Sequence, residues 1–198
     1  MAQSFFRWWR KRLKREYRRL RQLYELETRF TTARIEEDVQ IINPARLHLG
    51  HQVYICKGSV LHCGGEQWCD YRGGITIGDH VYIAPHCVLF GAGEIEIGNR
   101  CQFGPGVMLI AQSLDMRKII DESTLDQPSP PHVFGKITLE EGVMIGAGSI
   151  VLMGVRIGRG AYIASGCIIK KDVAPYSFVI PRDRYKIINR NSPLVIKK

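Results

Sequence analysis

No stretch of the chain approaches the roughly 20 consecutive apolar residues that a membrane-spanning helix needs. The sequence also lacks a secretory signal peptide, because basic residues continue through the place where the apolar core of such a peptide should lie. We therefore predict a cytoplasmic protein. In that compartment the six cysteines should remain reduced thiols rather than form disulfides.

Acidic residues are scarce at the N-terminus, which concentrates positive charge there. Residues 1–21 contain nine Lys or Arg and one Glu, a net of +8 out of the +9 of the whole chain. The remaining residues are close to neutral. Any anionic partner is therefore expected to bind the N-terminal segment rather than the body of the protein.

A regular metal-ligand spacing is missing as well. Cys63 and Cys69 are the nearest cysteine pair, and His62 lies beside them. The spacing of these thiols does not match that of a zinc knuckle. We expect no metal.

A repeat of six residues dominates the rest of the sequence. A large apolar residue returns at six-residue intervals in three blocks: Leu49, Ile55, Leu61, Ile77, Ile83 and Leu89, then Ile97, Phe103 and Leu109, then Leu139, Ile145, Val151, Ile157, Ile163 and Ile169. A period of six fits neither a helix nor a hairpin sheet. It fits an all-β solenoid whose triangular coils each hold three short strands, with the large apolar residue pointing inward.

Small residues accompany the inward positions. Gly or Ala often follows directly, as at Gly78 and Gly158, and Val or another small residue often stands four places on. We interpret these as corner residues, with glycine supplying backbone angles that other residues resist. Cys87, Cys101 and Cys167 occupy the fourth-place positions and are predicted to be small buried corner fillers.

The pattern divides the chain into three parts. Residues 1–30 are predicted to form a basic amphipathic helix, residues 31–180 a β-helix of about six coils, and residues 181–198 a C-terminal extension. Two interruptions break the repeat, a minor one at 63–74 and a major one at 112–135. Because a long excursion from a rigid solenoid is usually functional, we expect the major one to contribute to the functional site.

Residues 135–177 carry the clearest repeats. Over about residues 47–180 the sequence resembles the hexapeptide-repeat acetyltransferases, and most of all the sugar O-acetyltransferases that modify cell-surface polysaccharides. The resemblance implies a left-handed parallel β-helix, a homotrimer with active sites in the grooves between neighbouring prisms, and acetyl-CoA as the donor. It also implies that Ala147 and Ser165 hold the pantetheine arm through their backbone and that Lys171 meets the CoA phosphates.

The chain departs from that family in two places. The family's catalytic histidine activates the acceptor hydroxyl as a base and should stand at the start of the excursion, where this chain reads Gln112-Ser-Leu-Asp-Met116. After the last coil, Ile180-Pro-Arg-Asp-Arg-Tyr185 replaces the family's Gly-Asn-Pro turn, although Arg182 and Arg184 could still attract phosphates.

Three explanations of the missing histidine stay open. Another group acts as the catalytic base, and the candidates are Asp115, His86 and His132. Alternatively, the acceptor is an amine, which is already nucleophilic and depends less on a base. In the third explanation the activity is lost and the prism is a trimeric scaffold or binding protein. The favoured hypothesis is an O- or N-acetyltransferase acting on a sugar of a cell-surface polysaccharide or its lipid-linked precursor.

The N-terminal segment is predicted to be an amphipathic helix capped by Ser4. Its apolar stripe consists of Phe6, Trp9, Leu13, Tyr17, Leu20 and Tyr24. Aromatic residues beside a basic face are typical of helices that lie in an anionic lipid surface. We therefore predict peripheral membrane binding through Phe6, Trp8, Trp9, Arg10, Lys11 and Arg12. Packing on the prism or in a three-helix seam is an alternative, whereas nucleic acid is not the expected partner.

Overall fold

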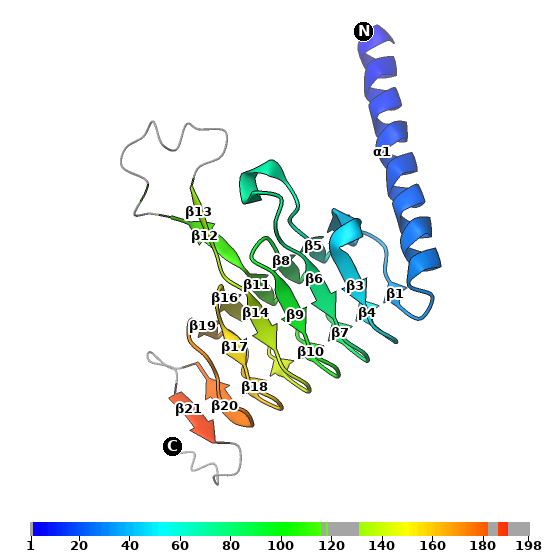
Figure 1. Cartoon of the computed structure of the whole chain (residues 1–198). Helices are drawn as coiled ribbons and strands as arrows, with labels where there is room; N and C mark the ends of the chain where they lie inside the picture. The colour runs from blue at the N-terminus through cyan, green and yellow to red at the C-terminus, as the bar shows by residue number, and fades with distance from the viewer. Residues whose placement is uncertain (1, 116–117, 119–130, 182–185, 190–198) are drawn as a thin grey trace.

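A computed structural model describes residues 2–115, 118, 131–181 and 186–189 of the chain. One long helix, α1 (Ala2–Arg29), precedes a prism built from short strands (Figure 1). The strands of the prism form three sheets, one on each side, which we call faces A, B and C, and two further strands form a separate two-stranded sheet outside it. The predicted left-handed parallel β-helix is confirmed.

Each face collects strands from successive coils. Face A contains β1 (Arg34–Ile35), β4 (Tyr54–Ile55), β7 (Tyr82–Ile83), β10 (Gln102–Phe103), β15 (Met144–Ile145), β18 (Tyr162–Ile163), β20 (Ser177–Ile180) and β21 (Lys186–Asn189). Face B contains β2 (Gln40–Ile42), β5 (Val60–His62), β8 (Val88–Phe90), β11 (Met108–Ile110), β16 (Ile150–Leu152) and β19 (Ile168–Ile169). Face C contains β3 (Leu47–Leu49), β6 (Ile75–Ile77), β9 (Ile95–Ile97), β14 (Ile137–Leu139) and β17 (Arg156–Ile157).

The described residues complete six coils, each running from face A through B to C. The sixth coil closes with a parallel bridge between Ile157 and Val173, and β20 then begins another turn on face A. In the segment predicted to be a C-terminal extension, β21 pairs antiparallel with β20. Arg182 and Arg184 lie outside the described residues.

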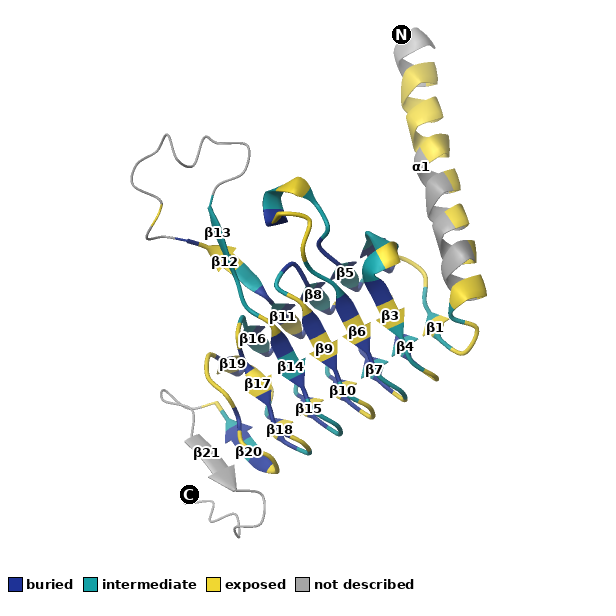
Figure 2. Cartoon of the chain, viewed as in Figure 1, coloured by how far each residue is buried: buried dark blue, intermediate teal, exposed yellow. Residues whose placement is uncertain are grey.

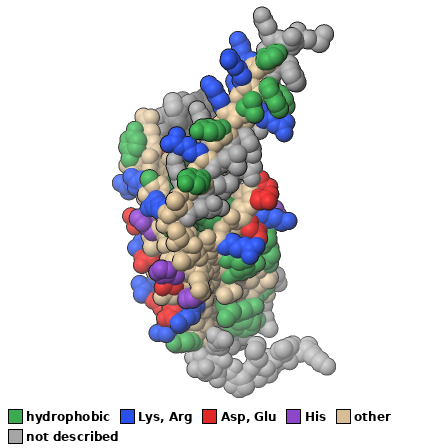
Figure 3. Space-filling model, turned by 90° about the vertical axis from the view of Figure 1, so that its right-hand side faces the viewer, with side chains coloured by type: hydrophobic (Ala, Val, Ile, Leu, Met, Phe, Trp, Pro, Cys, Tyr) green, Lys and Arg blue, Asp and Glu red, His purple; other side chains and the backbone are tan. Residues whose placement is uncertain are grey.

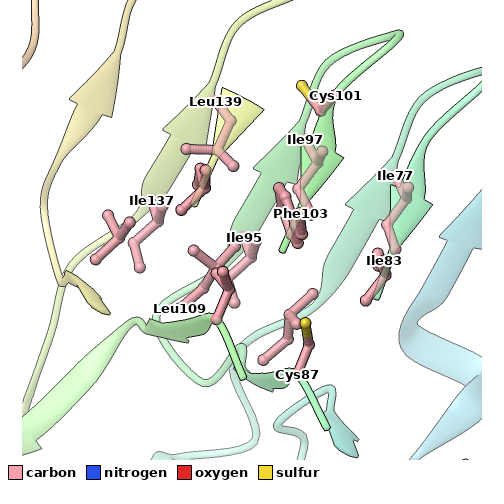
Figure 4. Close-up of a cluster of buried hydrophobic side chains, with 14 of the residues drawn as sticks. Ile77, Ile83, Cys87, Ile95, Ile97, Cys101, Phe103, Leu109, Ile137 and Leu139 are labelled. Atoms are coloured by element: carbon pink, nitrogen blue, oxygen red, sulfur yellow. The ribbon is translucent and has the colours of Figure 1, made fainter. Parts of the chain in front are cut away.

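The inward side chains stack in one column, as the six-residue period predicts (Figure 4). Ile77 pairs in register with Ile97, and Ile83 pairs with Phe103. All four are at most 2% exposed. Burying a side chain of this size stabilises the fold by about 1.5–3 kcal/mol, so the column supplies most of the driving force for coiling.

The glycine that follows an inward residue serves a different purpose from the one expected. A Cβ on Gly98 would lie 2.8 Å from the backbone carbon of Glu140, and one on Gly104 would lie 2.6 Å from the backbone nitrogen of Ala147. These glycines give the next coil room to approach closely. The left-handed backbone angles occur two residues later, at positions that include Gly148 (φ 66°) and the non-glycine His80 (φ 58°). The angle-based interpretation was therefore wrong.

The cysteines at the corners are buried, as predicted for Cys87, Cys101 and Cys167. Burial raises the pKa of the Cys87 and Cys101 thiols to about 11. Both thiols therefore stay protonated at neutral pH and act as small apolar fillers.

The helix α1 projects from the first coil instead of lying along the prism, and its described side chains are exposed (Figures 1 and 2). Its apolar residues include Phe6 (66% exposed), Trp8 (52%) and Trp9 (44%). Figure 3 shows hydrophobic and basic side chains side by side along this helix. Among the described residues, no helix is long and apolar enough to cross a membrane.

Candidate functional site

The major excursion leaves the fourth coil at the corner between faces B and C. Its two ends form an antiparallel ribbon of β12 (Gln112–Leu114) and β13 (His132–Phe134). Asp115 follows the ribbon and is only 4% exposed. Its backbone N–H donates to the carbonyl of Pro131 over 2.8 Å, and its Oδ2 lies 3.9 Å from Nζ of Lys118. The carboxylate is therefore largely shielded from solvent and lies near an ammonium group.

His132 lies on the far strand of the ribbon, opposite Leu114. Its ring centroid is 5.0 Å from that of Trp68, which belongs to residues 63–74, here called the minor loop. Phe134 extends the contact, with its ring 6.4 Å from Trp68 and the Arg72 guanidinium 5.5 Å above it. The two interruptions of the repeat therefore meet through aromatic side chains.

The carboxylate of Glu66 and the imidazole of His62 also belong to this group, and neither is among the predicted site residues. Glu66 Oε2 accepts a 2.5 Å hydrogen bond from Nε1 of Trp68 and lies 3.4 Å from Nε2 of His62. His62 belongs to β5 on face B, and its ring is 5.8 Å from Phe90. Only the four-residue spacing of His62 and Glu66 hinted at the pair, and that spacing is too common to be a signal.

His86, Ala147 and Ser165 lie along the opposite margin of face B, on the third, fifth and sixth coils. We call the turns between faces A and B the A–B corner, which includes residues 84–87, 146–149 and 164–167. Backbone hydrogen bonds link its successive levels, because Gly148 N–H donates to Pro105 O and Gly166 N–H donates to Ala147 O, each over 2.9 Å.

His86 is exposed at this A–B corner and has a positive φ of 60°. Its backbone N–H donates to the carbonyl of Lys57 over 3.1 Å. Lys171, by contrast, is exposed in the turn that leads from face B to face C, at the same margin as Asp115 and His132. The six predicted site residues thus form two groups on opposite margins of face B.

Face B is apolar on its outer surface as well as its inner one. Two outward columns run along it, one of Val60, Val88, Met108, Ile150 and Ile168, the other of Ile42, His62, Phe90, Ile110 and Leu152. Met108 is 38% exposed and Ile168 is 46% exposed. A continuous apolar surface of this kind is typical of a protein interface.

Face C is polar and carries the ion pairs. Its outward residues include Glu96, whose Oε2 lies 2.7 Å from Nζ of Lys136, and Arg156, whose guanidinium lies 2.5 Å from Glu140. The hydrogen bond to Glu96 raises the pKa of Lys136. Two adjoining hollows of about 470 and 670 Å³ lie along this face. In the part of the chain that the structure describes, no group of three or more metal-ligating side chains comes together.

Comparison with known proteins finds relatives with the same repeats. Residues 136–171 match the family described as bacterial transferase hexapeptide (six repeats). Galactoside O-acetyltransferase of Lactococcus lactis is 27% identical over 142 residues, which cover 70% of this chain and 60% of the relative. A 2,3,4,5-tetrahydropyridine-2,6-dicarboxylate N-acetyltransferase of Staphylococcus aureus is 38% identical over 63 residues, 32% of this chain and 26% of the relative. The chain spans 51–60% of the length of the first three curated relatives it matches.

Solved structures show the same fold. An N-acyltransferase, AntD from Bacillus cereus, in complex with dTDP and 3-hydroxybutyryl-CoA, superposes with a TM-score of 0.67 at 20% identity, over 88% of this chain and 90% of AntD. A hexapeptide-repeat-containing acetyltransferase from Vibrio cholerae superposes with a TM-score of 0.60 at 23% identity, over 75% of this chain and 77% of that one. The resemblance to hexapeptide-repeat acyltransferases is confirmed.

Proposed function

We propose that this chain, whose repeats are those of bacterial hexapeptide transferases, is an acetyl-CoA-dependent acyltransferase that modifies a sugar. Its acceptor is a sugar of a cell-surface polysaccharide or of a lipid-linked precursor. The observation that carries the proposal is the exposed A–B corner, where consecutive coils stack Ala147 below Ser165 with regular backbone hydrogen bonds. Relatives that use both oxygen and nitrogen acceptors support acyl transfer as the common chemistry.

The proposed reaction needs a donor site and a proton acceptor. The acceptor oxygen or nitrogen attacks the thioester carbonyl carbon, a base takes its proton, and the CoA thiol leaves with a proton when the tetrahedral intermediate collapses. The pantetheine arm lies along the A–B corner at Ala147 and Ser165. Lys171, at the opposite margin of face B, would meet the phosphates from the neighbouring chain. Asp115 is buried, so His86 and His132 are the better candidates for the base.

A homotrimer would unite the two groups of site residues. The outward apolar columns of face B need a cover, and the polar face C does not. A ring of three chains closed through face B places the A–B corner of one chain beside the B–C margin of its neighbour, because a heterologous interface joins opposite margins of the same face. Donor residues of one protomer and His132 of the next then share one groove.

The projecting helix supports peripheral attachment to an anionic membrane. Phe6, Trp8 and Trp9 are exposed with Arg10, Lys11 and Arg12 around them, and Arg12 lies 5.3 Å above the Trp8 ring. The aromatic rings enter the interface while the cations meet lipid phosphates. Such attachment would bring the prism close to a lipid-linked acceptor at the cytoplasmic face of the membrane.

Vesicle sedimentation of the full chain tests this attachment. Vesicles of phosphatidylcholine with phosphatidylglycerol should pellet the protein, and pure phosphatidylcholine vesicles should pellet far less of it. The double variant Trp8→Ser, Trp9→Ser should stay in the supernatant, whereas the matched Tyr71→Ser change in the minor loop should have no effect. Equal sedimentation of the parent and the Trp variant would exclude the helix as the membrane site.

Calorimetry with acetyl-CoA and CoA tests the transferase itself. We expect binding to the parent and a large loss of affinity for Ser165→Trp, whose side chain would fill the A–B corner. The competing function is a non-enzymatic trimeric scaffold, which the glutamine at the start of the excursion favours. No heat of binding at millimolar ligand would reject the enzyme and leave the scaffold.

A further inference from the structure

The minor loop brings an indole, a carboxylate and an imidazole together beside the excursion ribbon. Trp68 is half-buried, with His132 on one side at 5.0 Å and His62 on another at 5.7 Å between ring centroids. Glu66 accepts from the Trp68 indole N–H, and its side chain remains 41% exposed. This combination lies next to His132, one of the two better candidates for the base.

We propose that Trp68, Glu66 and His132 form the acceptor subsite and that its ligand is an uncharged pyranose ring. The inference rests on the proposed acyltransferase function and specifies its substrate class. A pyranose presents C–H groups on its faces and hydroxyl groups around its rim. An aromatic ring packs against the first and a carboxylate accepts hydrogen bonds from the second.

The contacts of Glu66 orient its carboxylate for hydrogen bonding to a sugar. In the described part of the chain, both Trp68 Nε1 and His62 Nε2 contact the same oxygen, Oε2. Because the Glu66 side chain remains 41% exposed, the carboxylate can also accept a hydrogen bond from a sugar hydroxyl. Because neighbouring groups already orient the carboxylate, binding costs little side-chain entropy.

The minor loop is held firmly enough to act as a platform. The Arg46 guanidinium donates to the carbonyls of Gly73 and Tyr71 over 2.8 and 2.6 Å, and the side chain of Cys69 within the loop is fully buried. Asp70 and Tyr71 both have positive φ, 50° and 55°. Two consecutive non-glycine residues in this conformation are strained, and such strain is commonly retained where function needs it.

The ribbon beside the subsite also contains a buried polar atom. The side-chain oxygen of Gln112, opposite Phe134 in the ribbon, is buried and has no hydrogen-bond partner among the described residues. An orphaned acceptor of this kind is costly, and a donor from water or ligand removes the cost.

Acceptor kinetics and direct binding test the proposal. With acetyl-CoA and a panel of methyl hexopyranosides, Trp68→Ala should raise the acceptor KM by up to about tenfold, and Glu66→Gln should raise it as well. The KM for acetyl-CoA should stay unchanged in both. Glu66→Gln keeps the shape of the side chain, so its effect is separable from misfolding. Tyr162→Ala on face A is the matched control and should behave as the parent.

Two results would overturn the acceptor subsite. One is an unchanged acceptor KM in both Trp68→Ala and Glu66→Gln. The other is the absence of saturation transfer from the parent protein to every pyranoside in an NMR experiment. Calorimetry with CoA on the same samples reports separately on the transferase, so loss of the subsite and loss of the proposed function remain distinguishable.

Discussion

Two kinds of glycine in the coils should respond in opposite ways to the same substitutions. Gly98 has no positive φ, but a Cβ there would lie 2.8 Å from the backbone of Glu140 and Glu141. That backbone cannot retreat, because Gly98 N–H donates to Leu139 O over 2.7 Å and Glu140 N–H to Ile157 O over 2.9 Å. We expect Gly98→Ala to destabilise the fold by about 1–3 kcal/mol through overpacking, and Gly98→Asn by at least as much.

Gly148 presents the reverse situation. Its φ is +66°, and a Cβ there would meet nothing within 4 Å. Gly148→Ala should cost about 1–2 kcal/mol through backbone strain alone, and Gly148→Asn should cost clearly less, because asparagine tolerates this conformation. The chain itself has Asp38, His80 and Arg100 at equivalent positions, with φ of 58–59°.

Urea denaturation at one fixed protein concentration measures both pairs. A fixed concentration is needed because assembly would add to the apparent stability. Changes in the transition midpoint at constant slope report the free-energy differences. Two results would contradict these causes: a Gly98→Asn variant more stable than Gly98→Ala, or Gly148→Asn and Gly148→Ala variants of equal stability.

Three further predictions address the surface, the acid stability and the thiols. Met108→Glu with Ile168→Glu should reduce the oligomer to monomers of 22.5 kDa in light scattering, whereas Gln102→Glu on face A should not. Hydrogen bonds from Arg159 N–H and the Arg156 side chain lower the pKa of Glu140, so its contribution to stability is present above the ordinary carboxyl pKa and is lost as pH falls through the lowered value. Glu140→Gln should therefore flatten the acid limb of a stability–pH curve below about pH 4.5. Native protein should react slowly with a thiol reagent at pH 8, since all six thiols are buried, and should expose all six on unfolding.

The fold could be predicted from the sequence because a six-residue period fits a triangular coil of three short strands and fits neither a helix nor a hairpin sheet. Ile77, Ile83 and Leu89 must all point inward for the chain to coil, and they do. The six-residue pattern alone did not separate the two uses of glycine. Gly98 directly follows the inward Ile97 and leaves room for the next coil, whereas Gly148 stands two places further along its unit and has a positive φ.

The site was less predictable because it depends on irregular segments. Nothing in the spacing of Trp68 and His132, 64 positions apart, indicates that their rings lie 5.0 Å from each other. Asp115 was selected as a candidate base from its place in the sequence, yet its local environment buries it beside Lys118. Periodic patterns specify the prism, whereas contacts between excursions must be read from the structure.

The division of site residues between the two margins of face B makes assembly a requirement for the proposed chemistry. One protomer holds Ala147 and Ser165 at the A–B corner and His132 across the apolar face, so neither margin by itself contains a complete set of donor and acceptor groups. The monomeric Met108→Glu, Ile168→Glu variant should therefore keep its circular dichroism spectrum and lose acetyl transfer. Mixing a Ser165→Trp chain with a Trp68→Ala chain should restore part of the activity, because one groove of each mixed trimer then has two intact margins. If the monomeric variant stays active, or if mixed trimers gain nothing over either parent variant, each chain carries its own complete site and the shared groove is wrong.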